Sequence, residues 1–206
     1  MGKQPVIAWL LIMALVVPPH FVSASAAARP GRGDGRVICG ERLINGGFEQ
    51  GSLGWSQSSA AGHDLISDFY PRSGAWAAYL AGTNNADDRL SQTITLPANA
   101  ISSILTAWWA IATEEPEVGF DRLTASVLNA DGELLADLWT ADSSAMVNVW
   151  APIEADLLAY RGRTVILRLR AITDASNPTD FYVDDVSLLV CAPMQVVYLP
   201  MMTLAR

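Results

Sequence analysis

The chain has 206 residues, with 13 basic and 21 acidic side chains and a net charge of −8 at pH 7. Its hydrophobic fraction of 51% provides enough apolar side chains for one domain with a real core. The acidic balance and the lack of a basic stripe argue against nucleic acid as a partner.

The first 26 residues have the layout of a secretory signal peptide. Lys3 supplies a positive charge, an apolar run VIAWLLIMALVV follows at 6–17, and 24–26 (ASA) fits an A-x-A cleavage site, with 26–28 as the alternative. The apolar run is shorter than the roughly 20 residues that a bilayer span needs, so a cleaved leader is favoured over an uncleaved anchor. We therefore expect a secreted, extracellular or cell-surface protein whose mature chain has no membrane span.

Residues 27–36 (AARPGRGDGR) combine Gly, Pro and Arg without periodicity and predict a flexible linker. The linker contains Arg-Gly-Asp at 32–34, the tripeptide that some cell-adhesion receptors bind. Chance alone readily produces this match in such a composition, so we expect no adhesive role from it.

From Val37 onward, short apolar or alternating runs are separated by turn clusters about every ten residues, as is typical of a β-sandwich. The hairpin signal NADG at 129–132 and a single helical turn within 153–160 complete the pattern. Strands are predicted at 43–48, 75–80, 90–96, 104–112, 123–128, 134–139, 164–171 and 181–190. The fold class is therefore all-β, a two-sheet antiparallel β-sandwich over 37–192, followed by a tail at 193–206.

The two cysteines, Cys39 and Cys191, bracket almost the whole predicted domain. In the oxidising compartment that a signal peptide implies, an even number of cysteines usually pairs. A disulfide is therefore favoured over two free, buried thiols. It would join the ends of the domain if the first and last strands are neighbours.

The last predicted strand, FYVDDVSL, carries two adjacent aspartates. Neighbouring residues of a strand point to opposite faces, so one carboxylate must point toward the core side and needs a partner there. Asp184 shares its parity with Tyr182, Val186 and Leu188, which selects it over Asp185 as the inward residue.

A cation is one such partner. Glu49, near the start of the domain, would meet Asp184 if the disulfide brings the two ends together. A hard cation with oxygen ligands, most simply Ca²⁺, would then satisfy both carboxylates, with backbone carbonyls from turns such as 45–47, beginning at Asn45, or 72–74. The alternative is an arginine partner, drawn from Arg42, Arg72 and Arg168.

Four segments together carry a family resemblance: NGGFEQGSLGW, SGAWAAYL, RLSQTITLPA and FYVDDVSL. With them the chain resembles the galactose-binding-like jelly-roll domains of secreted bacterial proteins, which include many carbohydrate-binding modules. It is also similar to accessory domains of secreted peptidases and, more distantly, to MAM domains. The resemblance covers 43–190 and implies a jelly roll with a structural calcium between a Glu near the first strand and an Asp in the last, which match Glu49 and Asp184.

The ligand-binding candidates are aromatic and cationic. In the predicted strands Trp108 lies outside, as do Arg168 and Arg170, and together they would form a mixed surface for a sugar, an acidic glycan or a protein edge. The alternative is a Trp108 that is covered by a loop. Trp55 and Tyr70, together with Phe120, are candidates at loop tips, although most tryptophans are expected to be core fillers.

Catalysis is not expected. His63 and its neighbour Asp64 diverge in an extended segment, and no G-x-S-x-G or H-E-x-x-H motif is present. The acidic cluster at 114–121 is most simply a solvated loop. The sequence therefore predicts a secreted, non-catalytic module that binds a polysaccharide or cell-envelope glycan. The alternative is a structural or adhesive domain that binds an extracellular protein, and a hydrolase ranks third.

Overall fold

A computed structural model describes residues 35–113, 115, 119–145 and 147–194. The predicted signal peptide, the Arg-Gly-Asp tripeptide and nearly all of the predicted tail lie outside these residues. Within the described ranges, no helix is long and apolar enough to cross a membrane.

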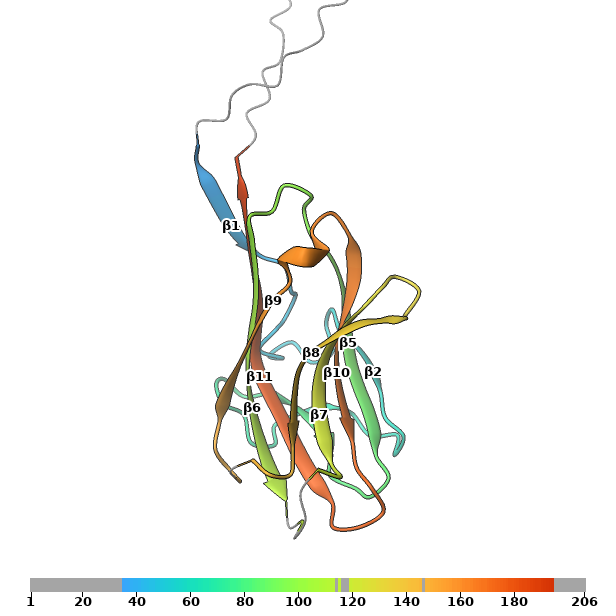
Figure 1. The fold of residues 1–206 in the computed structure, drawn as a ribbon. Coiled ribbons are helices and arrows are strands. Elements are labelled where there is room, and N and C mark those ends of the chain that lie inside the picture. Colours follow the sequence, from blue (N-terminus) through green and yellow to red (C-terminus); the bar gives the residue numbers. More distant parts are fainter. Residues whose placement is uncertain (1–34, 114, 116–118, 146, 195–206) are drawn as a thin grey trace, which may run out of the picture.

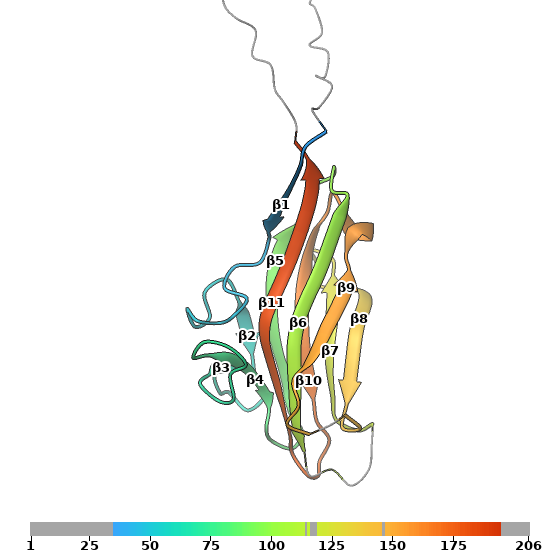
Figure 2. The same cartoon turned by 90° about the vertical axis from the view of Figure 1, so that its left-hand side faces the viewer.

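The strands form two antiparallel sheets that stack face to face, as Figures 1 and 2 show. The first sheet has the order β3 (Ile66–Ser67), β4 (Ala77–Ala81), β11 (Thr179–Pro193), β6 (Ser102–Thr113) and β9 (Ala151–Asp156), and β1 (Val37–Glu41) also pairs with β11. The second sheet has the order β2 (Ser56–Ser58), β5 (Asp87–Thr95), β10 (Thr164–Ile172), β7 (Arg122–Leu128) and β8 (Leu134–Asp142). The all-β, two-sheet antiparallel prediction is confirmed.

Some predicted elements were wrong. The segment 43–48 is a loop rather than the first strand, because Asn45 and Phe48 have φ values of 53° and 59°, in the left-handed region that interrupts a strand. The short strands β2 and β3 were missed, and so was β9, which contains Pro152 and lies at a sheet edge where proline is tolerated. The helical turn is a 3₁₀ turn at Leu158–Tyr160 that follows β9.

The first and last strands are neighbours. β1 pairs antiparallel with the end of β11, with Cys39 directly opposite Cys191, and the two strands run together at one end of the molecule in Figure 1. Their sulfur atoms form a disulfide between Cα atoms 3.9 Å apart. The predicted disulfide is therefore confirmed, and it links the two ends of the domain.

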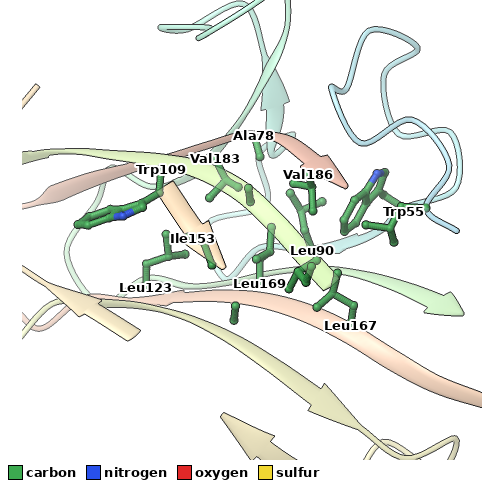
Figure 3. Packing of buried hydrophobic residues seen from close by; sticks show 14 of the residues in the cluster. Trp55, Ala78, Leu90, Trp109, Leu123, Ile153, Leu167, Leu169, Val183 and Val186 are labelled. Carbon is green, nitrogen blue, oxygen red and sulfur yellow. The ribbon is translucent and has the colours of Figure 1, made fainter. Parts of the chain in front are cut away.

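The core fills the space between the sheets. Figure 3 shows Trp109 and Val183 of the first sheet facing leucines of the second, among them Leu123 and Leu169. Alternate residues of β10 point inward and are completely buried, while the residues between them are partly exposed. Burying one such leucine contributes roughly 1.5–3 kcal/mol, so these strands supply much of the stability of the fold.

A β-bulge in β11 changes which side chains face the core. The register with β6 shifts between Asp184 and Ser187, and Asp185 has a φ of 52°. Val183 before the bulge and Val186 after it both join the core cluster, although their parities differ. Asp184 therefore lies on the outer side of the sheet. The expectation that it shares a face with Val186 was wrong, because the extra residue shifts the alternation.

Candidate cation site and candidate ligand-binding face

Asp184 is 0% exposed although it lies on the outer face of the first sheet. The loop between β3 and β4 covers it. Its Oδ2 accepts hydrogen bonds from the backbone N–H groups of Arg72 at 2.9 Å and Ser73 at 3.1 Å, and Oδ1 accepts one from Asp185 at 2.7 Å. Burial raises the pKa of this carboxyl above its ordinary value, and the N–H donors only partly offset the effect.

Glu49 binds the same loop. Its carboxylate accepts backbone hydrogen bonds from Ala75 and Trp76, each at 3.0 Å. Gly74 lies between these anchor points, with a φ of 63°, and a Cβ there would come within 2.2 Å of the Glu49 Oε1 atom. The structure thus brings Glu49 and Asp184 onto one five-residue loop, 72–76, which we call the anchored loop.

Within the described ranges, no arginine forms an ion pair with Asp184. The guanidinium of Arg72 lies 2.5 Å from the neighbouring Asp185, whose other oxygen accepts a hydrogen bond from Ser73. Arg168 lies in the opposite sheet. Among the residues that the structure describes, no basic side chain comes within ion-pair distance of Asp184, so its charge is compensated only by backbone dipoles.

The donor set is suited to a hard cation only with help from the backbone. No group of three or more His, Cys, Asp or Glu side chains gathers as metal ligands within the described ranges. Two carboxylates at one loop supply oxygen alone, which suits Ca²⁺ rather than Zn²⁺. The remaining oxygens of a six- to eight-fold shell would have to be carbonyls of the adjoining turns or water.

Asn45 is occupied within its own loop. Its backbone carbonyl accepts hydrogen bonds from the indole of Trp55 at 3.0 Å and from Phe48, and its side-chain amide bonds Gly51 and Gln50. These contacts give Asn45 a structural role in shaping the turn that carries Glu49. They do not support the prediction of Asn45 as a direct metal ligand.

Two aromatic candidates from the sequence are covered. Trp55 is only 6% exposed and belongs to the core, so the prediction that it presents a ring at a loop tip was wrong. Trp108 lies on the outer face of β6, as expected, but the guanidinium of Arg72 stacks over its ring at 3.8 Å. That arginine comes from the anchored loop, which confirms the alternative of a Trp108 covered by a loop.

Arg168 and Arg170 do not join Trp108. They point outward from β10 in the second sheet, whereas Trp108 points outward from the first, so the sandwich separates them. Arg170 is bonded to Asp87 by two hydrogen bonds of 2.7 and 2.8 Å. The mixed aromatic and cationic surface that the sequence suggested is therefore absent.

Tyr70 is instead the start of a different surface. It is 42% exposed, stacks on Trp150 at 5.7 Å and contacts Tyr182 at 5.2 Å. Tyr182 stacks on Tyr79, and Tyr79 on Phe69, each pair with ring centroids 5.6 Å apart. These five rings form a continuous row on the outer face of the first sheet, which we call the aromatic row.

One carboxylate holds two phenols of the aromatic row. The hydroxyls of Tyr79 and Tyr182 donate to the two oxygens of Asp180, at 2.9 and 3.4 Å. Burial, reinforced by the charge of Asp180, raises the pKa of Tyr79 far above its ordinary value and that of Tyr182 to about 12. Both phenols therefore remain protonated at any physiological pH, and Asp180 remains a fixed acceptor between them.

A cleft of about 600 Å³ opens beside this cluster. Figure 2 views the first sheet, with β11, β6 and β9 side by side, and the cleft lies where β4 and β6 end and β11 begins. Tyr79 and Asp180 form its polar wall, and Tyr70 donates a hydrogen bond to the carbonyl of Asn148 at its rim. The lining residues are Tyr79, Gly82, Ala112, Thr113, Val147, Asn148, Pro178 and Asp180.

His63 has a partner that the sequence did not suggest. Its Nε2 lies 3.5 Å from the buried carboxylate of Asp88, rather than near Asp64, and its Nδ1 lies 3.3 Å from the hydroxyl of Ser59. That hydroxyl accepts two backbone N–H groups of its own turn, and Nε2 makes no hydrogen bond. The three residues stabilise the segment before β3 and are not arranged as a hydrolytic triad.

Comparisons with known protein families and with curated protein sequences find no match. Solved structures do match. TmCBM61 in complex with β-1,4-galactotriose superposes with a TM-score of 0.53 at 16% identity, over 72% of this chain and 97% of that chain. The K3 cleaved adhesin domain of Lys-gingipain from Porphyromonas gingivalis W83 gives 0.52 at 18% identity, over 72% and 98%.

A Stig cyclase, Fisc from Fischerella sp. TAU, is also similar, with a TM-score of 0.48 at 14% identity, over 77% of this chain and all of that chain. At such identities the likeness concerns the fold and not the activity. The chain has the two-sheet β-sandwich fold that carbohydrate-binding modules share with adhesin domains.

Proposed function

We propose that the protein is an exported glycan-binding module and that its glycan site is the cleft beside the aromatic row. The observation that carries the proposal is that Tyr79, a partly exposed ring of the aromatic row, and the carboxylate of Asp180 line one cleft. Sugars present C–H groups on one side of the ring and hydroxyls around its edge. An aromatic face packs against the C–H groups, and a carboxylate accepts hydrogen bonds from the hydroxyls.

The size and chemistry of the cleft agree with this assignment. Its volume of about 600 Å³ falls within the range of small-molecule sites. Among the described residues that line it, Asp180 is the only charged one, so neutral sugars fit better than acidic ones. The disulfide supports export to an oxidising compartment.

Calorimetric titration with a panel of polysaccharides tests the proposal. β-1,4-Galactan, the polymer related to the ligand of TmCBM61, is the first probe, beside cellulose, xylan and mannan. Tyr79→Ala should weaken binding about tenfold, since it removes the aromatic face of the cleft, worth about 1–1.5 kcal/mol. Leu134→Ala, an exposed apolar change in the second sheet, is the control. No binding to any member of the panel would refute the proposal.

A structural calcium ion at Glu49 and Asp184 is part of the same proposal. Its support is the burial of Asp184, which has no basic partner among the described residues, and the contacts of both carboxylates with the anchored loop. When bound, the ion would supply the positive charge that this site lacks. Glu49 and Asp184 would then hold it while their N–H contacts keep the loop closed.

Calcium binding is tested by thermal unfolding in chelator and in excess Ca²⁺. Chelation should lower the melting temperature of the wild-type protein. Glu49→Gln or Asp184→Asn should remove most of that difference, whereas Asp131→Asn, an exposed acid in the β7–β8 loop, should leave it intact. Identical melting curves with and without chelator would exclude the ion.

Protein binding is the second candidate function. Large apolar side chains lie exposed near the cleft, including Phe69 at 63% and Val147 and Val149 at 44% each. A flat apolar patch suits a protein partner better than a sugar. A protein-binding domain would bind no glycan in the panel. Its binding to cell-surface protein would be reduced by Phe69→Ala.

A further inference from the structure

On its outer face, the strands of the second sheet carry four arginines, Arg89, Arg122, Arg168 and Arg170, and three aspartates, Asp87, Asp137 and Asp142, so the arginines are in excess by one. Arg89 on β5 and Arg170 on β10 lie opposite each other, and both pair with Asp87. Arg168, two residues along β10, has no carboxylate within ion-pair distance among the described residues. A cation placed beside two other cations raises the energy of the fold unless something compensates it.

Two guanidinium nitrogens on this face are buried without a hydrogen-bond partner in the described structure. They are the Nε atoms of Arg89 and Arg168, which are diagonal neighbours across the β5–β10 pair. Unsatisfied buried donors are uncommon in native proteins, and each one calls for an explanation such as a bound ion. Burial, then the nearby charges of Arg170 and Arg89, lowers the pKa of Arg168, which expresses the same lack of compensation.

The neighbours of Arg168 are hydroxyls. Ser91 on β5 and Ser126 on β7 lie directly opposite it on either side, so their side chains share its face. The hydroxyl of Ser126 donates a hydrogen bond to Asp137, which lies opposite it on β8. The Arg168 side chain is partly exposed, and its two cross-strand neighbours offer hydroxyl groups as hydrogen-bond donors and acceptors.

We propose that Arg168, flanked by Arg89 and Ser91, forms a site for an oxyanion, the carboxylate of an acidic sugar or a sulfate group. The guanidinium presents N–H donors in a fork that matches such oxygens. A bound anion would compensate Arg168, which has no carboxylate within ion-pair distance among the described residues. The site lies on the opposite side of the sandwich from the cleft, so it is independent of the function proposed there.

The site is tested by chemical-shift titration at constant ionic strength, with sodium chloride as the balancing salt. The probes are sodium sulfate, sodium galacturonate and galactose, which differs from galacturonate by the absence of the carboxylate. Saturable shifts of the β5 and β10 amides are expected with sulfate or galacturonate and not with galactose. A response to sulfate alone would identify a sulfate site, and a response to galacturonate alone a uronate site.

Variants separate a specific site from general charge attraction. Arg168→Gln should weaken the binding of the anion at least tenfold, whereas Arg161→Gln, which removes an equal charge from an exposed turn, should leave it unchanged. Tyr79→Ala, which alters the cleft, should also leave it unchanged. The absence of saturable binding, or equal losses in the two arginine variants, would overturn the proposal.

A stability measurement distinguishes a ligand-binding role from a structural one. If Arg168 serves the fold, Arg168→Gln lowers the melting temperature without any anion present. The proposed site predicts an unchanged or higher melting temperature instead, because the substitution removes a repelled charge. It also predicts that sulfate raises the melting temperature of the wild-type protein more than that of the variant. A lower melting temperature with an unchanged response to sulfate would contradict the site.

Discussion

Replacing Asp184 tests whether this carboxylate anchors the loop between β3 and β4. Asp184→Ala leaves three backbone N–H groups without their acceptor, those of Arg72, Ser73 and Asp185. An unsatisfied buried donor costs about 1–3 kcal/mol, and the loop can partly open to water, so we expect a loss of about 3–6 kcal/mol. That is a large share of the roughly 5–15 kcal/mol that stabilises a typical domain.

Asp184→Asn should destabilise the fold much less than Asp184→Ala when chelator is present. The amide keeps one acceptor oxygen, so the loss should be about 1–2 kcal/mol, offset by removal of a buried charge. Urea denaturation followed by tryptophan fluorescence measures both variants. A loss below about 1 kcal/mol for Asp184→Ala would show that the carboxylate does not anchor the loop and would refute the reasoning.

The difference in stability between wild-type protein and Asp184→Asn should change with pH in a defined direction. The pKa of Asp184 is raised in the folded state, so the folded protein binds the proton more tightly than the unfolded chain. In chelator, wild-type protein should therefore gain stability relative to Asp184→Asn as the pH falls from the raised pKa toward the ordinary value near 4. If the wild-type protein instead lost stability relative to Asp184→Asn as the pH falls, the fold would stabilise the ionised carboxylate. We expect that opposite behaviour when Ca²⁺ is present.

Three further predictions concern other parts of the fold. Reducing the Cys39–Cys191 disulfide, which spans 152 residues, should lower the free energy of unfolding by up to about 5 kcal/mol, measured by denaturation with and without reductant; no change would show that the link is unimportant. In absorbance titration Tyr182 should ionise near pH 12, and the stability its proton provides should fall between its unfolded pKa near 10 and that value; a Tyr182→Phe variant whose absorbance change near pH 12 is as large as that of the wild type would contradict this. Gly74→Ala should displace Glu49 and lower the melting temperature, and wild-type stability would show that the loop adapts.

The fold could be predicted from the sequence because its signals are local. Strict alternation in 164–171 and 90–96 gave the inward and outward residues of β10 and β5 correctly. The disulfide followed from the even number of cysteines and the oxidising compartment that the predicted signal peptide implies. The β-bulge was not predictable, because one extra residue after Asp184 reverses the parity while leaving the local composition unchanged.

The candidate site was harder to predict because it depends on which strands become neighbours. Trp108 and Arg168 both point outward, as expected, yet their strands belong to different sheets, and alternation alone cannot reveal that. Tyr182 points outward from β11, whereas the alternation pattern predicted it on the inward face with Asp184. Tyr79 lies directly opposite Tyr182 only through the β4–β11 register, which is not encoded locally.

Mapping a bound glycan by amide chemical shifts tests the central claim most directly. The first polysaccharide of the panel that binds should be titrated as a short oligosaccharide into labelled protein. The account predicts that the largest shifts fall on the residues around the cleft, among them Tyr79, Asn148 and Asp180, and that they saturate together. Shifts confined to other parts of the surface, or none with any sugar of the panel, would contradict it.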